Sequence, residues 1–394
     1  MPTFTGLDIL AENDFEQIRG ESVGLLCNQA SVSRDLVHAV DLLMPHHGKE
    51  LNLRAVFGPQ HGLHGHTQDN MIEWEGAHDH RTNIPVYSLY GEHREPTDEM
   101  LKGVDLFVVD LQDVGARYYT FIWSMALCMK ACERLGIPVL VLDRPNPIGG
   151  LQTEGPLLDP ALTSFVGLYP IPTRHGMTIA EIAKHLQTQY FQNLKLEWIS
   201  MTGWSRSDYF DDLDLKWVTP SPNMPVPDTA VVYPGMCLLE ATNLSEGRGT
   251  TRPFETFGAP WLDCWKLAAA LTNLELPGAH FRPVQFQPTF NKFSGELCNG
   301  CFLHVKQRRA FEPVLTTFAI LRECAKLSGG KFEWKAPPYE YEMEKRPIDI
   351  LLGKKGLAEE ILGDAPLNQI RQSLIQDAAE FEPQRKASLL YPTS

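Results

Sequence analysis

Short apolar runs alternate with stretches of helical periodicity between residues 22 and 142. The apolar runs predict five strands, at 22–27, 51–57, 86–89, 104–110 and 137–142. Between them, residues 34–44 and 117–135 repeat apolar side chains every three or four positions, and Gly136 ends the second of these predicted helices. Strands that alternate with helices in this way are typical of parallel βαβ units. The pattern therefore predicts an α/β fold with a doubly wound, mostly parallel sheet.

The pattern changes in the second half of the chain. Thr178 and Glu181 form a predicted capping box that opens a helix over 178–190, ahead of a strand near 194–201. The segment 217–260 is rich in proline, which excludes regular helix and central strand, so we expect a rigid loop layer that lines a site. Beyond it, the pattern predicts two helices and a strand of a smaller α/β domain, at 261–274, 313–327 and 301–305.

Composition and charge exclude several classes of partner. The chain of 394 residues carries 35 basic and 49 acidic side chains, a net charge of −14, which disfavours a nucleic-acid partner. No run of 18 apolar residues occurs, so we expect no membrane insertion, and the first residues show no signal peptide, so we expect a cytoplasmic protein. The eight cysteines are scattered through apolar stretches, which predicts reduced, buried thiols.

Polar loops follow four of the predicted strands. In an open parallel sheet these loops meet at the carboxyl edge, where ligands bind. We therefore expect a cleft formed by loops 28–31, 58–66, 110–117 and 143–147 and closed by 221–225 and 243–252. The substrate-binding candidates in these loops are Asn28, Gln60, Gln112, Arg117, Asp143, Arg144, Asn146, Asn223, Asn243, Glu246, Arg248 and Thr250.

Asp110 and Asp113 are the sharpest catalytic candidates. They lie three residues apart in a strand-to-helix turn, with Arg117 at the start of the next predicted helix. A nearby cation holds one carboxylate ionised while crowding raises the pKa of the other, which would supply a base and an acid. The alternative is structural: Asp113 would cap the helix and Asp110 would pair with Arg117.

A metal or nucleotide cofactor is not expected. His61, His64 and His66 could assemble a metal site, but their loop is rich in glycine and has no helical frame to hold ligands. The sequence contains neither a P-loop nor a G-x-G-x-x-G motif. A metal-dependent hydrolase that uses the three histidines stays as an alternative.

The same loops resemble those of the NamZ/YbbC-like exo-β-N-acetylmuramidases, glycoside hydrolase family 171, over nearly the whole chain. The matching stretches include 58–62, 85–91, 110–120, 142–147, 164–167, 175–178, 220–225 and 242–251. The resemblance implies a Rossmann-like N-terminal domain, which we place at 1–235, and a smaller α/β C-terminal domain at 236–394, with a cleft between them. It also implies release of terminal N-acetylmuramic acid from the non-reducing end of peptidoglycan-derived saccharides.

The chain departs from the family at one position, because Gln60 stands where the common pattern has a glutamate. A glutamine cannot transfer a proton, so either another carboxylate acts, with Glu73 a further candidate beside Asp110 and Asp113, or the substrate differs. His61 and Tyr119 would orient the sugar or relay protons. Arg117 and Arg248 would bind the lactyl carboxylate of muramic acid, because a guanidinium fork matches a carboxylate. A non-catalytic saccharide-binding protein is the remaining alternative.

Overall fold

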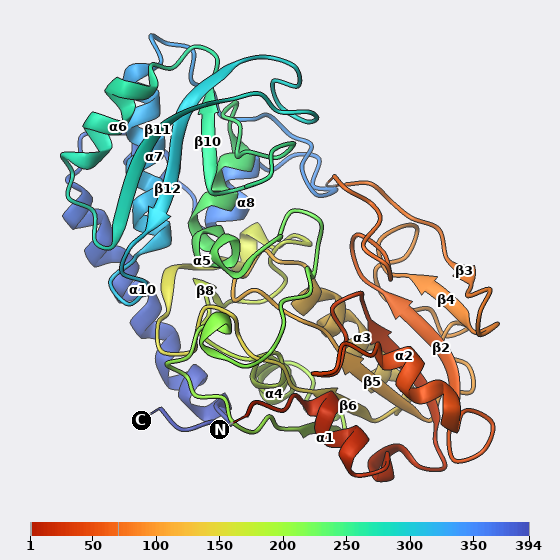
Figure 1. The fold of residues 1–394 in the computed structure, drawn as a ribbon. Coiled ribbons are helices and arrows are strands. Elements are labelled where there is room, and N and C mark those ends of the chain that lie inside the picture. Colours follow the sequence, from red (N-terminus) through yellow and green to blue (C-terminus); the bar gives the residue numbers. More distant parts are fainter. Residues whose placement is uncertain (1, 70, 394) are drawn as a thin grey trace.

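The computed structural model describes residues 2–69 and 71–393, and its first domain is built on a seven-stranded sheet (Figure 1). The strand order is β3-β4-β2-β1-β5-β6-β9, and all neighbours are parallel except β3 and β4. The strands are β1 (Ser22–Cys27), β2 (Asn52–Gly58), β3 (Ala77–His78), β4 (Pro85–Ser88), β5 (Leu106–Asp110), β6 (Val139–Leu142) and β9 (Leu196–Ile199). The predicted α/β class is confirmed.

The central strands are apolar throughout because helices and loops cover both faces of the sheet. Every residue of β5 and β6 is buried, as expected for parallel strands in a doubly wound fold. The helices of this domain are α1 (Gly6–Glu12), α2 (Ala39–Leu43), α3 (Phe121–Leu135) and α4 (Ile179–Gln189). The predicted capping box is present at the start of α4, and Gly136 ends α3 in a left-handed conformation.

Two predicted helices begin later than the periodicity suggested. Residues 34–38 are not helical, because Leu36 has a φ of +62° and Ser33 N donates to Val37 O at 2.9 Å, which closes a turn. In α3, the first four predicted residues form a turn ahead of the helix, because Tyr119 N donates to Ala116 O at 3.0 Å and Arg117 N donates to Thr173 O at 2.8 Å. This contact ties the segment before α3 to a two-stranded sheet of β7 (Glu154–Leu157) and β8 (Pro172–Arg174).

The second, smaller domain has an antiparallel sheet of order β10-β12-β11, from β10 (Thr256–Ala259), β11 (Ala279–Phe286) and β12 (Cys298–Val305). Helices α6 (Cys264–Thr272) and α7 (Pro313–Leu327) pack together beside it (Figure 1). Periodicity missed β11, which contains Pro283, and an edge strand is where a sheet tolerates proline. All eight cysteines are buried and free, as predicted.

The prediction for segment 217–260 was partly wrong, because the segment contains helix α5 (Pro227–Met236) and a 3-10 turn over Cys237–Ala241. Pro227 lies in the first turn of α5, where a backbone N–H would have no partner inside the helix, and Pro234 lies near its end. The parts on either side of α5 are irregular, and both contribute side chains to the pocket described below.

The two domains are connected by buried polar contacts and by the last helix. Helices α8 (Pro347–Leu352) and α9 (Leu357–Leu362) lead into α10 (Leu367–Ser388), which returns to pack on α4 and β7 of the first domain (Figure 1). Arg385 of α10 donates to the carbonyl of Gly176 at 3.1 Å. Among the residues that the structure describes, no helix is long and apolar enough to cross a membrane.

Candidate active site

A pocket of about 450 Å³, its open mouth included, lies between the two domains, and we call it the interdomain pocket. The first domain contributes Gln60 and His61, which follow β2, and residues 118–121 at the start of α3. The second half of the chain supplies the opposite wall. The lining residues from that half are Ser221, Asn223, Met224, Tyr233, Glu240, Arg248, Phe254, Tyr339 and Glu340.

The loop after β2 is held so that His61 faces this pocket as a neutral imidazole. The Trp74 ring lies against Gly58, where an added Cβ would come within 2.6 Å of it, and its Nε1 donates to the Pro59 carbonyl at 3.0 Å. His61 Nδ1 lies 2.8 Å from the Thr67 carbonyl, which fixes Nδ1 as the donor and leaves Nε2 as the acceptor. Burial lowers the pKa of His61 to about 4, so the ring is uncharged at neutral pH.

A chain of hydrogen bonds runs from the first domain to Glu340 of the second. Thr120 Oγ1 donates to Gln60 Oε1 at 2.7 Å, and Gln60 Nε2 donates to the Tyr90 hydroxyl at 3.1 Å. The Tyr90 hydroxyl in turn donates to Glu340 Oε2 at 2.7 Å. The three hydrogen bonds point in one direction, because each donor in the chain faces one acceptor. Gln60 therefore orients Tyr90, and Tyr90 orients the carboxyl group of Glu340.

Glu340 is a carboxyl group that keeps its proton near neutral pH. Burial raises its pKa to about 7, and the negative charge of Glu240 acts in the same direction. The hydrogen bond from Tyr90 and the positive charge of Arg248 oppose the shift without cancelling it. A pocket carboxyl group with such a pKa can donate a proton to a leaving group at neutral pH.

The second carboxyl group of the pocket, Glu240, accepts hydrogen bonds from a guanidinium and a phenol hydroxyl. Arg248 Nη2 donates to its Oε1 at 2.7 Å, and the Tyr339 hydroxyl donates to its Oε2 at 2.6 Å. Arg248 Nε also lies 3.4 Å from Glu246 Oε1, and Lys292 Nζ lies 2.9 Å from the other oxygen of Glu246. Burial opposes the charge of Arg248, but the two glutamates raise its pKa, so the guanidinium stays charged.

One donor of the pocket, Nη1 of Arg248, is buried without a hydrogen-bond partner among residues 2–69 and 71–393. The hydroxyl of Tyr119 is buried as well, and its side-chain neighbour is Ser221. Burial raises the pKa of Tyr119, so its hydroxyl keeps its proton and can donate. Buried donors are normally satisfied, because an unmet donor costs about 1–3 kcal/mol. Arg248 Nη1 is therefore available to a ligand in the pocket, and the Tyr119 hydroxyl can exchange Ser221 for one.

Asp110 and Asp113, the predicted catalytic pair, lie outside the lining of the interdomain pocket. Asp110 is fully buried and paired with Arg144, whose Nη2 donates to Oδ2 at 2.8 Å, and not with Arg117, the structural partner predicted for it. Asp113 Oδ2 accepts from Gly115 N at 2.6 Å and lies 3.1 Å from His175 Nε2. It does not cap α3, because that helix begins eight residues later, at Phe121.

Arg117 has a structural role that contradicts its predicted contact with a substrate carboxylate. Its guanidinium is fully buried and donates to four backbone carbonyls at 2.8–3.0 Å, of Pro156, Ile171, Leu351 and Leu352. Burial lowers its pKa to about 10, so it is still charged at neutral pH. The contacts to Leu351 and Leu352 attach α8 to the first domain, and no terminal nitrogen is left for a ligand.

Several predicted substrate-binding residues hold the strand-end loops together. Asn28 donates to the Pro220 carbonyl and Asn146 to the Met177 carbonyl, both at 2.9 Å, and Gln112 donates to the carbonyls of Asp113 and Pro145. Asp143 accepts from the Thr178 hydroxyl at 2.8 Å and from the Tyr391 hydroxyl at 2.6 Å, and burial raises its pKa to about 7. These contacts explain why such residues follow the strands without touching the interdomain pocket.

The remaining candidates divide between the pocket and its surroundings. Asn223 lines the pocket and donates to the Gln68 carbonyl at 2.9 Å, and Glu246 lies behind Arg248. Asn243 and Thr250 bond to nearby backbone, at Lys331 and Gly247, and do not line the pocket. Glu73 is half exposed, with its carboxylate 3.8 Å from Arg94.

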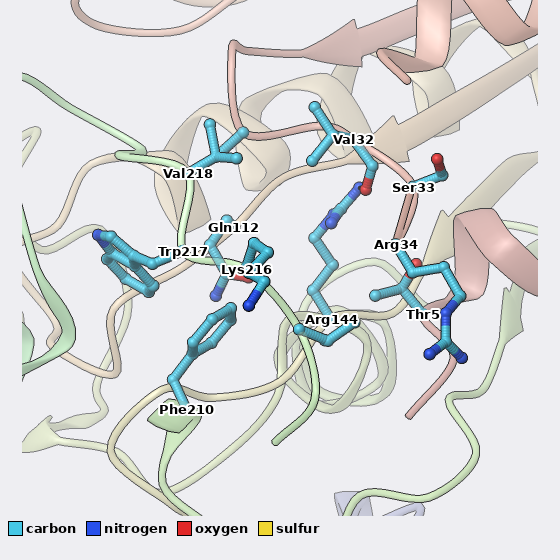
Figure 2. Close-up of a pocket in the computed structure, with 12 residues that line it drawn as sticks. Thr5, Val32, Ser33, Arg34, Gln112, Arg144, Phe210, Lys216, Trp217 and Val218 are labelled. Atoms are coloured by element: carbon cyan, nitrogen blue, oxygen red, sulfur yellow. The ribbon is translucent and has the colours of Figure 1, made fainter. Parts of the chain in front are cut away.

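The strand-end loops form a second pocket, of about 380 Å³, which we call the strand-end pocket (Figure 2). It lies after β1, β5 and β6 and shares no lining residue with the interdomain pocket, so the single predicted cleft is two pockets. Figure 2 shows Arg144 reaching to Val32, whose carbonyl it contacts at 2.9 Å. The lining residues are Thr5, Ala30, Val32, Ser33, Arg34, Gln112, Arg144, Phe210, Leu215, Lys216, Trp217 and Val218.

Sequence reasoning did not select Glu340, Tyr90 or Tyr339. Glu340 lies in the stretch 337–342, Pro-Pro-Tyr-Glu-Tyr-Glu, which shows neither helical nor strand periodicity. Two prolines followed by two tyrosines in an irregular segment were the signal available, since rigid aromatic loops often line sites. Nothing in the local pattern indicates that this segment meets the loop after β2.

His61, His64 and His66 do not come together as the ligands of a metal site in the described part of the chain. Within the described ranges, no three His, Cys, Asp or Glu side chains lie together as a metal site requires. His61 also directs its Nδ1 to the Thr67 carbonyl rather than toward the other two histidines.

Fold and site together define a two-domain α/β enzyme with two buried carboxyl groups in an aromatic-walled pocket, an arrangement that glycoside hydrolases use. Residues 23–228 match the family described as exo-β-N-acetylmuramidase NamZ, N-terminal, and residues 231–391 match its C-terminal counterpart. The chain therefore belongs to the NamZ family of glycosidases, as its sequence indicated.

Individual relatives agree with this assignment. The chain is 42% identical over 388 residues to the peptidoglycan β-N-acetylmuramidase NamZ of Bacillus subtilis, covering 98% of this chain and 91% of the relative. Two crystal structures of DUF1343 family proteins from Bacteroides fragilis are also similar. One has a TM-score of 0.87 at 32% identity and covers 99% of both chains, and the other has a TM-score of 0.77 at 25% identity and covers 100% of both chains.

Proposed function

We propose that the interdomain pocket hydrolyses the bond to a terminal N-acetylmuramic acid at the non-reducing end of peptidoglycan-derived saccharides. The observation that carries this proposal is the pair of unlike carboxyl groups, Glu340 and Glu240, in one pocket. Glu340 is poised to hold a proton at neutral pH, and Glu240 is paired with a guanidinium. Cleavage of a glycosidic bond needs one carboxyl group of each kind.

In this mechanism Glu340 donates its proton to the leaving oxygen as the bond breaks. Glu240 supplies the negative charge that stabilises the positive charge developing on the sugar, as base or nucleophile. Asp110 is bound to Arg144 and takes no part in the reaction. Gln60 contributes through Tyr90, because it transfers no proton and fixes the hydroxyl group that contacts Glu340.

Arg248 is the residue in this pocket suited to the lactyl carboxylate that distinguishes muramic acid from other amino sugars. Its Nη1 is buried and unpaired among the described residues, and a charged donor in a desolvated site binds a carboxylate strongly. The guanidinium lies over the Phe254 ring, 5.1 Å from the centroid, which fixes its plane. Tyr119 offers a second donor, and the surrounding aromatic rings supply apolar faces for the sugar.

The test is to compare Glu340→Gln on two substrates that differ in leaving group. A disaccharide of N-acetylmuramic acid and N-acetylglucosamine needs an acid, whereas a p-nitrophenyl glycoside of N-acetylmuramic acid has a leaving group that departs unaided. We expect kcat to fall roughly 10²- to 10⁴-fold on the disaccharide and far less on the nitrophenyl glycoside. Equal losses on both substrates, or none, would remove Glu340 from the role of acid.

Glu240→Gln is the matched control, because a base or nucleophile is needed whatever the leaving group. It should lower kcat similarly on both substrates. If the unmodified protein binds N-acetylmuramic acid but turns over neither substrate, the chain is the saccharide-binding protein that Gln60 left open, and the proposed reaction is wrong.

A further inference from the structure

The turn that carries Glu340 has an unusual backbone. Tyr339 and Glu342 exchange two backbone hydrogen bonds, at 3.0 and 2.9 Å, and the two residues between them have φ values of +45° (Glu340) and +65° (Tyr341). Two positive φ values in succession define a type I′ hairpin turn, which normally uses Asn-Gly. Side chains with a Cβ are strained there, so contacts elsewhere must hold the turn in this form.

The contacts that hold the turn come from the first domain. The Arg94 guanidinium lies over the ring of Tyr341, 3.5 Å from the centroid, and 5.6 Å from the ring centroid of Phe165. Tyr90 meets Tyr341 edge-on at 5.7 Å, and its hydroxyl donates to Glu340. Each of the two strained residues therefore has its own partner in the first domain.

The main contact of the Arg94 guanidinium is its stacking on the ring of Tyr341. Its Nε and Nη2 are buried, Nη2 lies 3.8 Å from the carboxylate of Glu73, and the Tyr341 hydroxyl interacts with both Arg94 and Glu73. Arg117, in a structural role, directs both terminal nitrogens to four backbone carbonyls. The geometry of Arg94 instead favours the face of Tyr341, a cation–π contact that gains strength when it is shielded from water.

We propose that Arg94 is a positioning residue, which clamps Tyr341 and thereby keeps the strained turn 339–342 closed with Glu340 inside the pocket. This inference rests on the proposed function of Glu340. Misplacing a catalytic group by about 1 Å can cost roughly 10²-fold in rate, so a clamp outside the pocket can control kcat. Glu73 keeps a part in this assembly, as the carboxylate beside Arg94 rather than as the acid.

Loss of the clamp has a specific signature in the pH profile. The groups that face Glu340 are Tyr90 and Gln60 from the first domain and Glu240 and Arg248 from the second. If the turn relaxes and Glu340 meets water, its pKa returns toward the ordinary value for a glutamate. The fall of kcat on the alkaline side then moves to lower pH, which general destabilisation of the fold would not cause.

The experiment measures kcat, KM and the pH profile on the disaccharide for Arg94→Ala, Arg94→Lys and the double variant Arg94→Ala with Tyr341→Gly. We expect Arg94→Ala to lower kcat roughly 10- to 100-fold with little change in KM, and to move the alkaline limb to lower pH. Lysine keeps the charge but not the planar stack, so Arg94→Lys should restore only part of kcat. Glycine relieves the positive φ, so the double variant should be faster than Arg94→Ala.

Arg81→Ala is the matched control, because Arg81 is exposed and pairs with Asp41 and Asp79 at the surface. It should leave kcat and the pH profile unchanged. An Arg94→Ala protein with an unshifted pH profile, or a double variant no faster than Arg94→Ala, overturns the clamp. If Glu340→Gln is inactive on the disaccharide while Arg94→Ala is fully active, the clamp alone fails. If Glu340→Gln is fully active, the proposed function fails first.

Discussion

The interdomain and strand-end pockets both contain arginines close to acidic side chains, but they use them differently. In the strand-end pocket, Arg144 uses Nε and Nη2 on Asp110 and the Val32 carbonyl, and Arg34 is paired with Asp214. In the interdomain pocket, Arg248 keeps an unpaired nitrogen although it contacts two glutamates. An arginine whose hydrogen bonds go to backbone carbonyls and a buried aspartate holds the loops together, and one whose terminal nitrogen faces a pocket without a partner is available to a ligand.

The same distinction separates the acidic residues. Asp110 is fully buried in a two-point contact with Arg144, and the pair supports the sheet edge. Glu340 is also buried, but its hydrogen bond comes from a neutral hydroxyl, so burial prevails and its pKa rises to about 7. Burial alone does not mark a catalytic carboxyl group; the nature of its partner decides.

The largest expected effect is on stability, from Asp110→Asn. Removing one partner of a buried ion pair leaves the Arg144 charge uncompensated, so the free energy of unfolding should fall by about 3–5 kcal/mol. The kcat of the protein that remains folded should not change. Asp214→Asn is the control, because Asp214 is exposed and pairs with Arg34 of the strand-end pocket, and it should change stability little. Urea unfolding of both variants measures the difference, and a stable Asp110→Asn protein with low kcat would restore Asp110 as a catalytic candidate.

Arg248→Lys should have the next largest effect. It should weaken recognition of the substrate. A lysine keeps the charge near Glu240 but loses the fork that leaves Nη1 for a carboxylate. We expect KM for the nitrophenyl glycoside of N-acetylmuramic acid to rise by roughly 10-fold or more, as for the loss of one charge-assisted hydrogen bond. The corresponding glycoside of N-acetylglucosamine lacks the lactyl carboxylate, and its slow turnover should not fall further. A similar loss on both glycosides would contradict the assignment.

The fold was predictable because parallel strands that are buried on both faces must be apolar, and β1 (Ser22–Cys27) was located to the residue. The site was less predictable. Both kinds of pocket draw on the same residue types in short loops, and the sequence does not say which arginine meets which carboxylate. Arg117 and Arg248 were equal candidates, yet one bonds to four carbonyls and the other lines the interdomain pocket.

Gln60 illustrates the same limit. Its position after β2 was recognised, but its role depends on residues at distant positions, Tyr90 and Glu340. The stretch 337–342 has no periodicity to place it, and only the packing of the second domain on the first brings Glu340 to the pocket. A catalytic residue in an irregular segment that crosses between domains is the kind that pattern analysis misses.

A smaller effect is expected from pH. Because burial raises the pKa of Glu340 from the ordinary value of 4.5 to about 7, the folded protein binds this proton more tightly than the unfolded chain does. Glu340 therefore stabilises the fold least above pH 7, and its contribution is lost as the pH rises from about 4.5 through 7. Glu340→Gln should remove this loss, so its stability relative to the unmodified protein should be greater at pH 8 than at pH 5. Thermal unfolding at the two pH values measures this, and an identical difference at both would show that Glu340 has an ordinary pKa.

The smallest effect is expected from Lys216→Ala, and it tests the comparison most directly. Lys216 lines the strand-end pocket, where we find no ion pair for it within the described residues, so it is the group there most able to hold an anionic ligand. If that pocket only joins loops, Lys216→Ala should leave kcat and KM unchanged on the disaccharide.

Lys292→Ala removes the same chemical group behind the interdomain pocket, where Lys292 contacts Glu246 at 2.9 Å and supports Arg248. It should lower kcat/KM, because an unpaired Glu246 would draw the guanidinium away from its position. A loss of activity in Lys216→Ala comparable to that in Lys292→Ala would mean that the saccharide reaches the strand-end pocket, and that satisfied hydrogen bonds do not separate the two pockets by function.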